Sequence, residues 1–364
     1  MIVLAVGVPC LLAVVATWGV RSLALRFGFV DHPGGHKRHD SPVALGGGIA
    51  IVLAVVLPLL VGALLAAIYG RQEPPEWLPE LLRTHLEGVA ARTPRLMVIL
   101  GGVLGLHLVG LFDDRRPLKP GVKFLAQLLA AGAAVFGANV RLLEMLPAPI
   151  SIGLTVLWIV LITNAFNFLD NMDGLSAGVA VIAAAIFAAA AMRAGQLFVP
   201  VVALVLVGVL LGFLAYNFAP ASIYMGDAGS MVIGYLLAVL TVQTTFYDPR
   251  QDLQPFGVLV PLVVLAVPLY DVASVCWHRH RAGTSIFRGD QRHFSHRLVQ
   301  RGMSVRAAVL TIYLATAVTA MSALILPRAS WPIAGVVFAQ CIFMVLMIAL
   351  LEHLGTRNGV QSSE

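Results

Sequence analysis

Asparagine and aspartate residues recur along this chain at a spacing that suits metal or phosphate chemistry. Asn164, Asn167, Asp170 and Asp173 follow one another at intervals of three residues. This spacing places them along one face if the helix continues through them. Amide and carboxylate oxygens are the hard ligands that Mg²⁺ prefers. Asparagines can instead join neighbouring membrane helices, but two carboxylates in the same stripe favour a ligand site.

Two other acidic motifs lie at the ends of apolar runs. Asp113 and Asp114 are adjacent, and two such carboxylates repel each other unless a cation or a proton intervenes. A metal site and a solvated pair balanced by Arg115 and Arg116 both fit this dipeptide. Asp227 stands among small residues just before an apolar run. It suits helix capping as well as metal binding, so both roles stay open.

Asp271 lies within an apolar run. An ionised side chain inside a membrane helix is costly, and such residues are usually paired or functional. A structural ion pair with Arg279 or a neighbouring basic residue is the alternative to a direct role in binding substrate.

Basic and histidine side chains concentrate after this run. Residues 277–306 hold seven arginines, namely Arg279, Arg281, Arg288, Arg292, Arg297, Arg301 and Arg306. Because a guanidinium grips phosphate oxygens bidentately, the segment predicts phosphate binding, although an anchor on anionic lipid gives the same pattern. We assign His293 and His296 to phosphate or sugar contacts, because no zinc pattern is completed around them. Lys37 adds cationic charge before a glycine run at 46–48.

The elements that must position these residues are membrane helices. The chain has 364 residues, of which 59% are hydrophobic, and a mean hydropathy of +0.90. Charged residues make up 12%, against about 25% in soluble domains. This composition excludes an ordinary soluble globule, and no basic–aromatic module of the nucleic-acid-binding kind is present.

Eleven apolar runs predict eleven transmembrane helices, since runs this long cross a bilayer as helices. They lie near 2–21, 45–69, 96–112, 122–138, 150–168, 176–192, 197–216, 229–246, 256–276, 307–326 and 331–351. We expect an all-α, polytopic protein with a single catalytic domain over 1–354 and a flexible cytoplasmic tail at 355–364.

Lysine and arginine in the connections set the predicted orientation. One side of the membrane carries 16 of the 24 Lys and Arg, with Lys123 at the start of the following helix counted among them; it holds residues 21–44, 113–121, 169–175, 217–228, 277–306 and the C-terminal tail. We therefore expect this side to be cytoplasmic, with the N-terminus outside and the C-terminus inside. The aspartates of the motifs fall on the same side, which the charge rule does not require. This imbalance indicates a site on the cytoplasmic face.

The motifs are specific when they are taken in order. They are Asp113-Asp114, the block from Asn164 to Gly174, Gly226-Asp227, Pro268-Leu-Tyr-Asp271, and a basic loop with His293 and His296. In this order the chain resembles the polyprenyl-phosphate N-acetylhexosamine-1-phosphate transferases, nearer to the branch that starts O-antigen and teichoic acid than to the peptidoglycan-precursor branch. Asn171 stands where that family usually has glycine, and Ser295 where it often has another histidine.

The resemblance implies transfer of a sugar-1-phosphate from a UDP-N-acetylhexosamine to undecaprenyl phosphate, with release of UMP, at the bacterial cytoplasmic membrane. It implies Mg²⁺, with Mn²⁺ as an alternative, held by Asp227 and Asn167. The residues expected to be catalytic are Asp113, Asp114 and Asp227, and those expected to bind substrate are Lys37, Lys123, Asn164, Asp170, Asp173, Asp271, Arg288, Arg292, His293 and His296. We expect direct attack by the lipid phosphate, with an aspartate of the pair as base or orienter; a covalent aspartyl-phosphate is the alternative.

Two other functions stay open on the sequence alone. The phospho-MurNAc-pentapeptide transferase of peptidoglycan synthesis is the nearest alternative within the family, although its basic loop carries a denser histidine run. A secondary transporter predicts carboxylates near the bilayer midplane and internal symmetry, and neither is clear here. The expected partners are the UDP-sugar, undecaprenyl phosphate and membrane lipid, with no nucleic acid and with a homodimer left open. The sequence does not name the sugar.

Overall fold

Helices make up almost all of the regular structure. The computed structural model describes residues 2–31, 42–70, 72, 74–76, 78, 80–248, 250, 253–283 and 293–354. Its elements are α1 (Ile2–Phe27), β1 (Val30–Asp31), β2 (Val43–Ala44), α2 (Gly47–Tyr69), α3 (Glu80–Arg83), α4 (Leu86–Arg115), α5 (Pro120–Ala138), α6 (Ala148–Leu169), α7 (Leu175–Arg193), α8 (Phe198–Asn217), α9 (Asp227–Gln243), η2 (Pro255–Leu259), α10 (Val260–Val264), α11 (Ala266–Arg281), α12 (Phe294–Gln300), α13 (Val305–Ala323), η3 (Leu326–Arg328) and α14 (Trp331–Leu354). The all-α prediction is confirmed.

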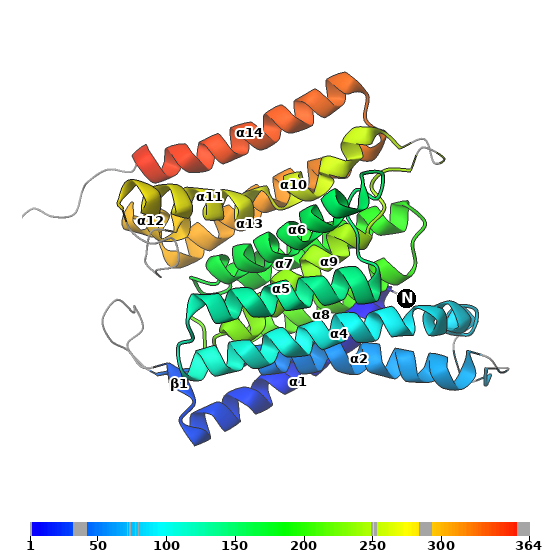
Figure 1. The fold of residues 1–364 in the computed structure, drawn as a ribbon. Helices are drawn as coiled ribbons and strands as arrows, with labels where there is room; N and C mark the ends of the chain where they lie inside the picture. Colours follow the sequence, from blue (N-terminus) through cyan, green and yellow to red (C-terminus); the bar gives the residue numbers. More distant parts are fainter. Residues whose placement is uncertain are drawn as a thin grey trace, which may run out of the picture.

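The helices run side by side, so that their ends gather at two opposite ends of the bundle (Figure 1). One end, which we call the site end, carries β1, α12 and the turn from α4 to α5. Hydrogen bonds tie distant segments together there: Arg21 Nε donates to the carbonyl of Ser222 at 3.3 Å, and Arg306 Nε to that of Ala219 at 2.8 Å. The connections that the sequence assigned to one side therefore do meet at one end.

Nine helices of the described residues are long and apolar enough to cross a membrane. They become ten if Pro255–Val264 and Ala266–Arg281, which meet at a bend of 64°, count as one broken span. All eleven predicted runs are helical, but α9 has only 17 residues, which makes it about 26 Å long. A polytopic membrane protein is confirmed, while the predicted orientation across the bilayer remains a prediction.

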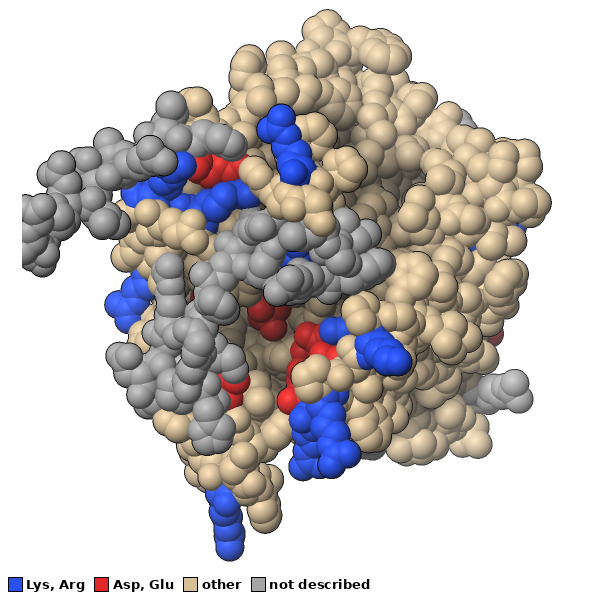
Figure 2. Space-filling model, turned by 60° about the vertical axis from the view of Figure 1, so that its left-hand side comes forward, with Lys and Arg blue, Asp and Glu red and all other residues tan. Residues whose placement is uncertain are grey.

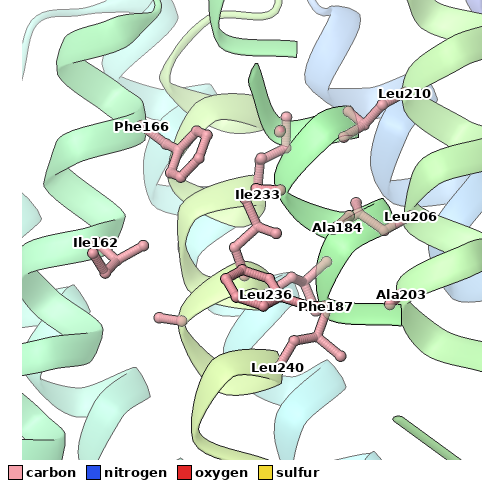
Figure 3. Close-up of a cluster of buried hydrophobic side chains, with 14 of the residues drawn as sticks. Ile162, Phe166, Ala184, Phe187, Ala203, Leu206, Leu210, Ile233, Leu236 and Leu240 are labelled. Carbon is pink, nitrogen blue, oxygen red and sulfur yellow. The ribbon is translucent and has the colours of Figure 1, made fainter. Parts of the chain in front are cut away.

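The short helix α9 lies inside the bundle. Its side chains Ile233, Leu236 and Leu240 gather with Phe166 of α6 and Phe187 of α7 in a buried hydrophobic cluster (Figure 3). All five are at most 4% exposed. Because α9 is surrounded by protein, its position depends on its neighbours rather than on lipid.

The boundary of α4 differs from the predicted span. We expected a helix over 96–112, but α4 begins at Leu86 and passes through Pro94. The added turns pack against the end of α2, because a Cβ built at Gly70 would lie 3.0 Å from that of Ala90. This contact, which apolar periodicity does not reveal, extends the helix.

Candidate active site

Three residues on α4 fix the first turn of α9. His107, Gly110 and Asp114 are spaced by three and four residues, which places them on one helical face. The Asp114 carboxylate accepts the backbone N–H of Asp227 at 2.8 Å and of Ala228 at 3.3 Å, and it therefore caps α9. His107 Nδ1 lies 3.0 Å from the carbonyl oxygen of Ala228 and donates to it. A Cβ at Gly110 would lie 2.4 Å from the Cα of Ala228, so α4 sets the position of Asp227.

Glycines at the start of α2 hold the segment that leads into α9. Gly47 N–H donates to the carbonyl of Tyr224 at 2.9 Å, and Gly48 N–H to that of Met225 at 3.0 Å. A Cβ at Gly48 would lie 2.5 Å from the backbone nitrogen of Gly229. Of the two uses that a glycine run allows, close packing and ligand contact, the structure shows close packing.

Lys123 of α5 lies between two carboxylates. Its Nζ is 2.8 Å from Asp227 Oδ2 and 3.1 Å from Asp113 Oδ2. The other oxygen of Asp113 accepts the N–H of Leu118 at 2.8 Å. Asp113 therefore faces Lys123, whereas its neighbour Asp114 faces the backbone of α9. We call Asp113, Asp114, Asp170, Asp173 and Asp227, together with Lys123, the carboxylate cluster. Figure 2 looks toward the site end and shows acidic side chains within a recess, with basic side chains around it.

The asparagine–aspartate stripe does not continue as one helical face. α6 ends at Leu169, and Asp170 takes the capping position beyond it. Asn164 is paired with Gln127: its Nδ2 donates to Oε1 at 2.6 Å. Asn167 Nδ2 donates to Ser230 Oγ at 3.0 Å. Asn164 therefore joins α6 to α5, while Asn167 and Asp170 lie nearer the charged cluster.

Asp173 fastens the segment between α8 and α9. Its Oδ2 accepts the backbone N–H of Ala221 at 2.8 Å. This oxygen of Asp173 is therefore engaged with the protein backbone.

Negative charge is in excess around the cluster. Burial, and then the charges of Asp227, Asp114 and Asp173, hold the pKa of Asp170 well above its ordinary value. Burial and nearby carboxylates also raise the pKa of Tyr224 to about 12. Among the described residues, none donates a hydrogen bond to the Asp170 carboxylate. In the part of the chain that the structure describes, the carboxylates of the cluster outnumber Lys123, the cation that pairs with them.

The donor set fits a hard divalent cation. Asp227 and Asn167 lie side by side, and Asp170 adds a carboxylate whose charge couples to that of Asp227. No three His, Cys, Asp or Glu side chains among the described residues form a ready metal cage. Mg²⁺ does not need one, because it keeps several waters and binds one or two carboxylates together with substrate phosphates.

On the other side of the site, Asp271 holds a histidine. Its carboxylate is fully buried; Oδ2 lies 2.8 Å from His293 Nδ1, and Oδ1 accepts the N–H of Phe294 at 3.2 Å. Both oxygens are used, so Asp271 supports His293 and is not exposed to substrate. The alternative to a substrate role was a structural ion pair with Arg279 or a neighbour, and the partner of Asp271 is His293. The Arg279 guanidinium instead lies over the ring of Phe168, 5.3 Å from its centre.

Three predicted substrate residues lie outside the described residues. They are Lys37, Arg288 and Arg292, and the predicted tail at 355–364 also falls there. Their roles remain predictions.

Sequence reasoning missed His107 and Gln127. His107 is a buried polar residue in an apolar run, seven residues before Asp114, and this spacing was the available signal. Gln127 follows Lys123 by four residues, so both lie on one face of α5.

Known proteins are similar to this chain over most of its length. Residues 96–245 match the model of glycosyl transferase family 4. A probable undecaprenyl-phosphate N-acetylglucosaminyl 1-phosphate transferase of Bacillus subtilis is 32% identical over 358 residues, which cover 95% of this chain and 91% of the relative. The chain belongs to glycosyl transferase family 4. The decaprenyl-phosphate N-acetylglucosaminephosphotransferase of Mycobacterium tuberculosis is 35% identical, over 85% of this chain and 78% of the relative. An undecaprenyl-phosphate alpha-N-acetylglucosaminyl 1-phosphate transferase of Yersinia pestis is 26% identical, over 83% and 78%.

Family membership confirms the resemblance seen in the motifs. The matched residues 96–245 run from within α4 to just beyond the end of α9 and contain the whole carboxylate cluster. The two positions at which this chain departs from the expected family pattern touch each other: Ser295 Oγ donates to Asn171 Oδ1 at 2.6 Å. Asn171 Nδ2 also donates to the carbonyl of Phe168 at 2.7 Å. This member of the family thus joins α12 to the end of α6 by a direct hydrogen bond.

Proposed function

We propose that this family 4 protein transfers N-acetylglucosamine-1-phosphate from UDP-N-acetylglucosamine to a polyprenyl phosphate and releases UMP. The observation that carries the proposal is Lys123 between Asp113 and Asp227, at one end of a membrane bundle. Relatives that align with most of the chain support it, because their names specify N-acetylglucosamine and a polyprenyl phosphate.

The reaction exchanges one phosphate oxygen for another. An oxygen of the lipid phosphate attacks the sugar-bearing phosphorus of the donor, and a new P–O bond forms. The bond from that phosphorus to the bridging oxygen breaks, and UMP leaves with the oxygen and its electron pair. Such transfers depend on in-line positioning and on neutralisation of charge. The ammonium of Lys123, which already bridges two carboxylates, is placed to contact incoming phosphate oxygens.

The two adjacent aspartates take different roles in this proposal. Asp113 Oδ2 contacts Lys123, so Asp113 orients the lipid phosphate and accepts its proton when the phosphate arrives as a monoanion. Asp114 accepts two backbone N–H groups of α9 and fixes Asp227. Direct attack needs no covalent bond to either carboxylate.

Asp227 and Asn167 would hold Mg²⁺, or Mn²⁺ in its place. When bound, the ion neutralises charge on the diphosphate. His293 and His296 contact the diphosphate or the sugar, while Asp170 and the free oxygen of Asp173 face the uridine. Lys37, Arg288 and Arg292 add predicted phosphate contacts. The excess of Lys and Arg on the side of the site, 16 of 24, supports a cytoplasmic site, where nucleotide sugars are available.

The test is UMP release by the purified protein. Polyprenyl phosphate and Mg²⁺ are supplied with UDP-N-acetylglucosamine, UDP-N-acetylgalactosamine or UDP-MurNAc-pentapeptide in separate reactions. We expect UMP and a labelled lipid product with UDP-N-acetylglucosamine. Product from UDP-MurNAc-pentapeptide alone would assign the peptidoglycan-precursor reaction instead. Absence of UMP with every donor, while the Bacillus subtilis relative is active in parallel, would overturn the proposal.

A single-turnover experiment separates the two chemical routes. Donor labelled in the phosphate next to the sugar is mixed with the protein without lipid acceptor. Direct attack predicts no label on protein, whereas recovery of a labelled aspartyl-phosphate would replace it with the covalent route.

A further inference from the structure

A very short helix carries the histidines of the site. α12 has seven residues and begins directly after His293. An isolated helix of this length is unstable in water. Its placement must therefore come from contacts with other segments. Asp271 and Asn171 supply two of these contacts at its first turn.

A buried ion pair supplies the contact at the second turn. Arg297 donates to Glu352 Oε2 from Nε at 3.0 Å and from Nη2 at 2.7 Å. The Glu352 side chain is 2% exposed and that of Arg297 is 15% exposed. Arg297 Nη2 also donates to Ser274 Oγ of α11. One guanidinium thus joins α12 to both α11 and α14.

Tyr270 connects this ion pair to the residue that follows His293. Its hydroxyl donates to Glu352 Oε1 at 2.8 Å, and its ring packs edge-to-face against that of Phe294, with centres 5.8 Å apart. Both oxygens of Glu352 are therefore engaged. The carboxylate is a link between helices and has no free oxygen for a ligand.

Glu352 is a buried carboxylate on a helix, α14, whose other side chains are mostly apolar and exposed. Its residues Phe343, Leu346 and Leu350 are 69%, 55% and 54% exposed, as expected of a helix that faces lipid. A charge near such a helix end is costly unless it is paired. Glu352 is paired, and its partner lies one turn after His293.

We propose that Glu352 and Arg297 are positioning residues that hold α12, and with it His293 and His296, against the donor-binding side of the site. The last membrane helix thereby acts on UDP-sugar binding without touching the substrate. This inference rests on the proposed function, because its readout is the kinetics of UMP release.

Glu352→Gln tests the pair in the full-length protein. Glutamine keeps the length and one acceptor oxygen but removes the charge. We expect the KM for UDP-N-acetylglucosamine to rise about ten-fold, because misplaced contact groups bind the donor poorly. The KM for polyprenyl phosphate should stay unchanged, because Asp113, Lys123 and Asp227 are held by contacts that do not involve Glu352 or Arg297. Arg297→Lys should act in the same way, since a single ammonium nitrogen cannot reproduce the two N–H bonds that Nε and Nη2 of the planar guanidinium give to Glu352.

Two comparisons separate positioning from general damage. Leu350→Ala, on an exposed face of the same helix, should leave both KM values at those of the unchanged protein. In a His293→Ala background, Glu352→Gln should raise the donor KM by a smaller factor than in the parent protein, because one of the two histidine contacts that it displaces is already missing.

The outcomes separate the inference from the function it rests on. An active parent whose donor KM is unaffected by Glu352→Gln, or whose two KM values rise equally, overturns the positioning role alone. Full additivity with His293→Ala also overturns it. A parent that releases no UMP contradicts the proposed function first.

Discussion

The two halves of the site are positioned by different physical means. In the carboxylate half, backbone lies against backbone: Gly110 touches Ala228, and Gly48 touches Gly229. In the histidine half, side chains hold one another, through Asp271 with His293, Ser295 with Asn171, and Arg297 with Glu352. Close packing leaves no room for an added atom, whereas a polar network responds to the loss of a charge or a donor.

This difference tells which changes each half should tolerate. The carboxylate half should fail on any increase in side-chain volume at its glycines. The histidine half should accept changes that preserve hydrogen-bonding groups and should weaken gradually as they are removed. The following tests run from the largest expected effect to the smallest.

Asp227→Asn should lower kcat about a thousand-fold, which is the order expected for loss of a group that stabilises transition-state charge. The variant also leaves Lys123 with one carboxylate partner instead of two. UMP release under saturating substrates and Mg²⁺ measures the effect. A thermal unfolding midpoint equal to that of the unchanged protein shows that the variant is folded. Near-normal turnover by the folded variant would contradict a catalytic role for Asp227.

Gly110→Ala should lower kcat about a hundred-fold, because a displaced α9 moves Asp227 out of line. The added Cβ would start 2.4 Å from Ala228 Cα, and we expect a lower Tm as well. Gly105→Ala is the matched control, since its Cβ meets nothing within 4 Å. Equal behaviour of the two variants would show that close packing does not position this half.

Asp114→Asn should reduce kcat about ten-fold, which corresponds to loss of about 1.4 kcal/mol of stabilisation. The amide oxygen still accepts one N–H from the start of α9, so the cap is weakened but not removed. Asp113→Asn should be more damaging, because Asp113 faces Lys123. The ratio of the two kcat values decides between the roles; an equal loss would contradict the division of the pair.

Ser295→Ala should raise the donor KM about five-fold, as expected for loss of one hydrogen bond worth about 1 kcal/mol. The change removes the hydrogen bond from Ser295 to Asn171 and leaves the ion pair between Arg297 and Glu352 intact. Ser22→Ala, at an exposed serine bonded within its own helix, is the control. An unchanged donor KM in Ser295→Ala would show that this link is dispensable.

Asp170→Asn should raise the Tm by about 2 °C at pH 7 without divalent cations. Because burial and nearby carboxylates raise the pKa of Asp170, the folded protein holds this proton up to a higher pH than the unfolded chain does. Stability is therefore lost as pH rises above the ordinary carboxyl range. Asparagine removes this dependence, so the gain should disappear at low pH. The measurement is the Tm of both proteins as a function of pH. A Tm difference that is the same at every pH would show that the gain does not come from the titration of Asp170.

The sequence by itself determined the class of protein and where its polar residues gather. Long apolar runs can only be membrane helices. Because successive helices cross the bilayer in alternating directions, their number places Asp113, Asp170 and Asp227 at the same end of the bundle. These are local properties, because hydropathy and alternation along the chain need no knowledge of packing. The order of the motifs along the chain also indicated the family to which the protein belongs.

Only the tertiary structure decided what each polar group does. Asp113 and Asp114 are adjacent and chemically identical, yet one meets Lys123 and the other meets α9, 113 residues further on. Asp271 meets His293, Asn164 meets Gln127, and Glu352 meets Arg297. Partners this far apart are set by which helix faces pack together and by where α6 ends. Hydrogen-bond geometry then selects among neighbours, which spacing along a single helix cannot specify.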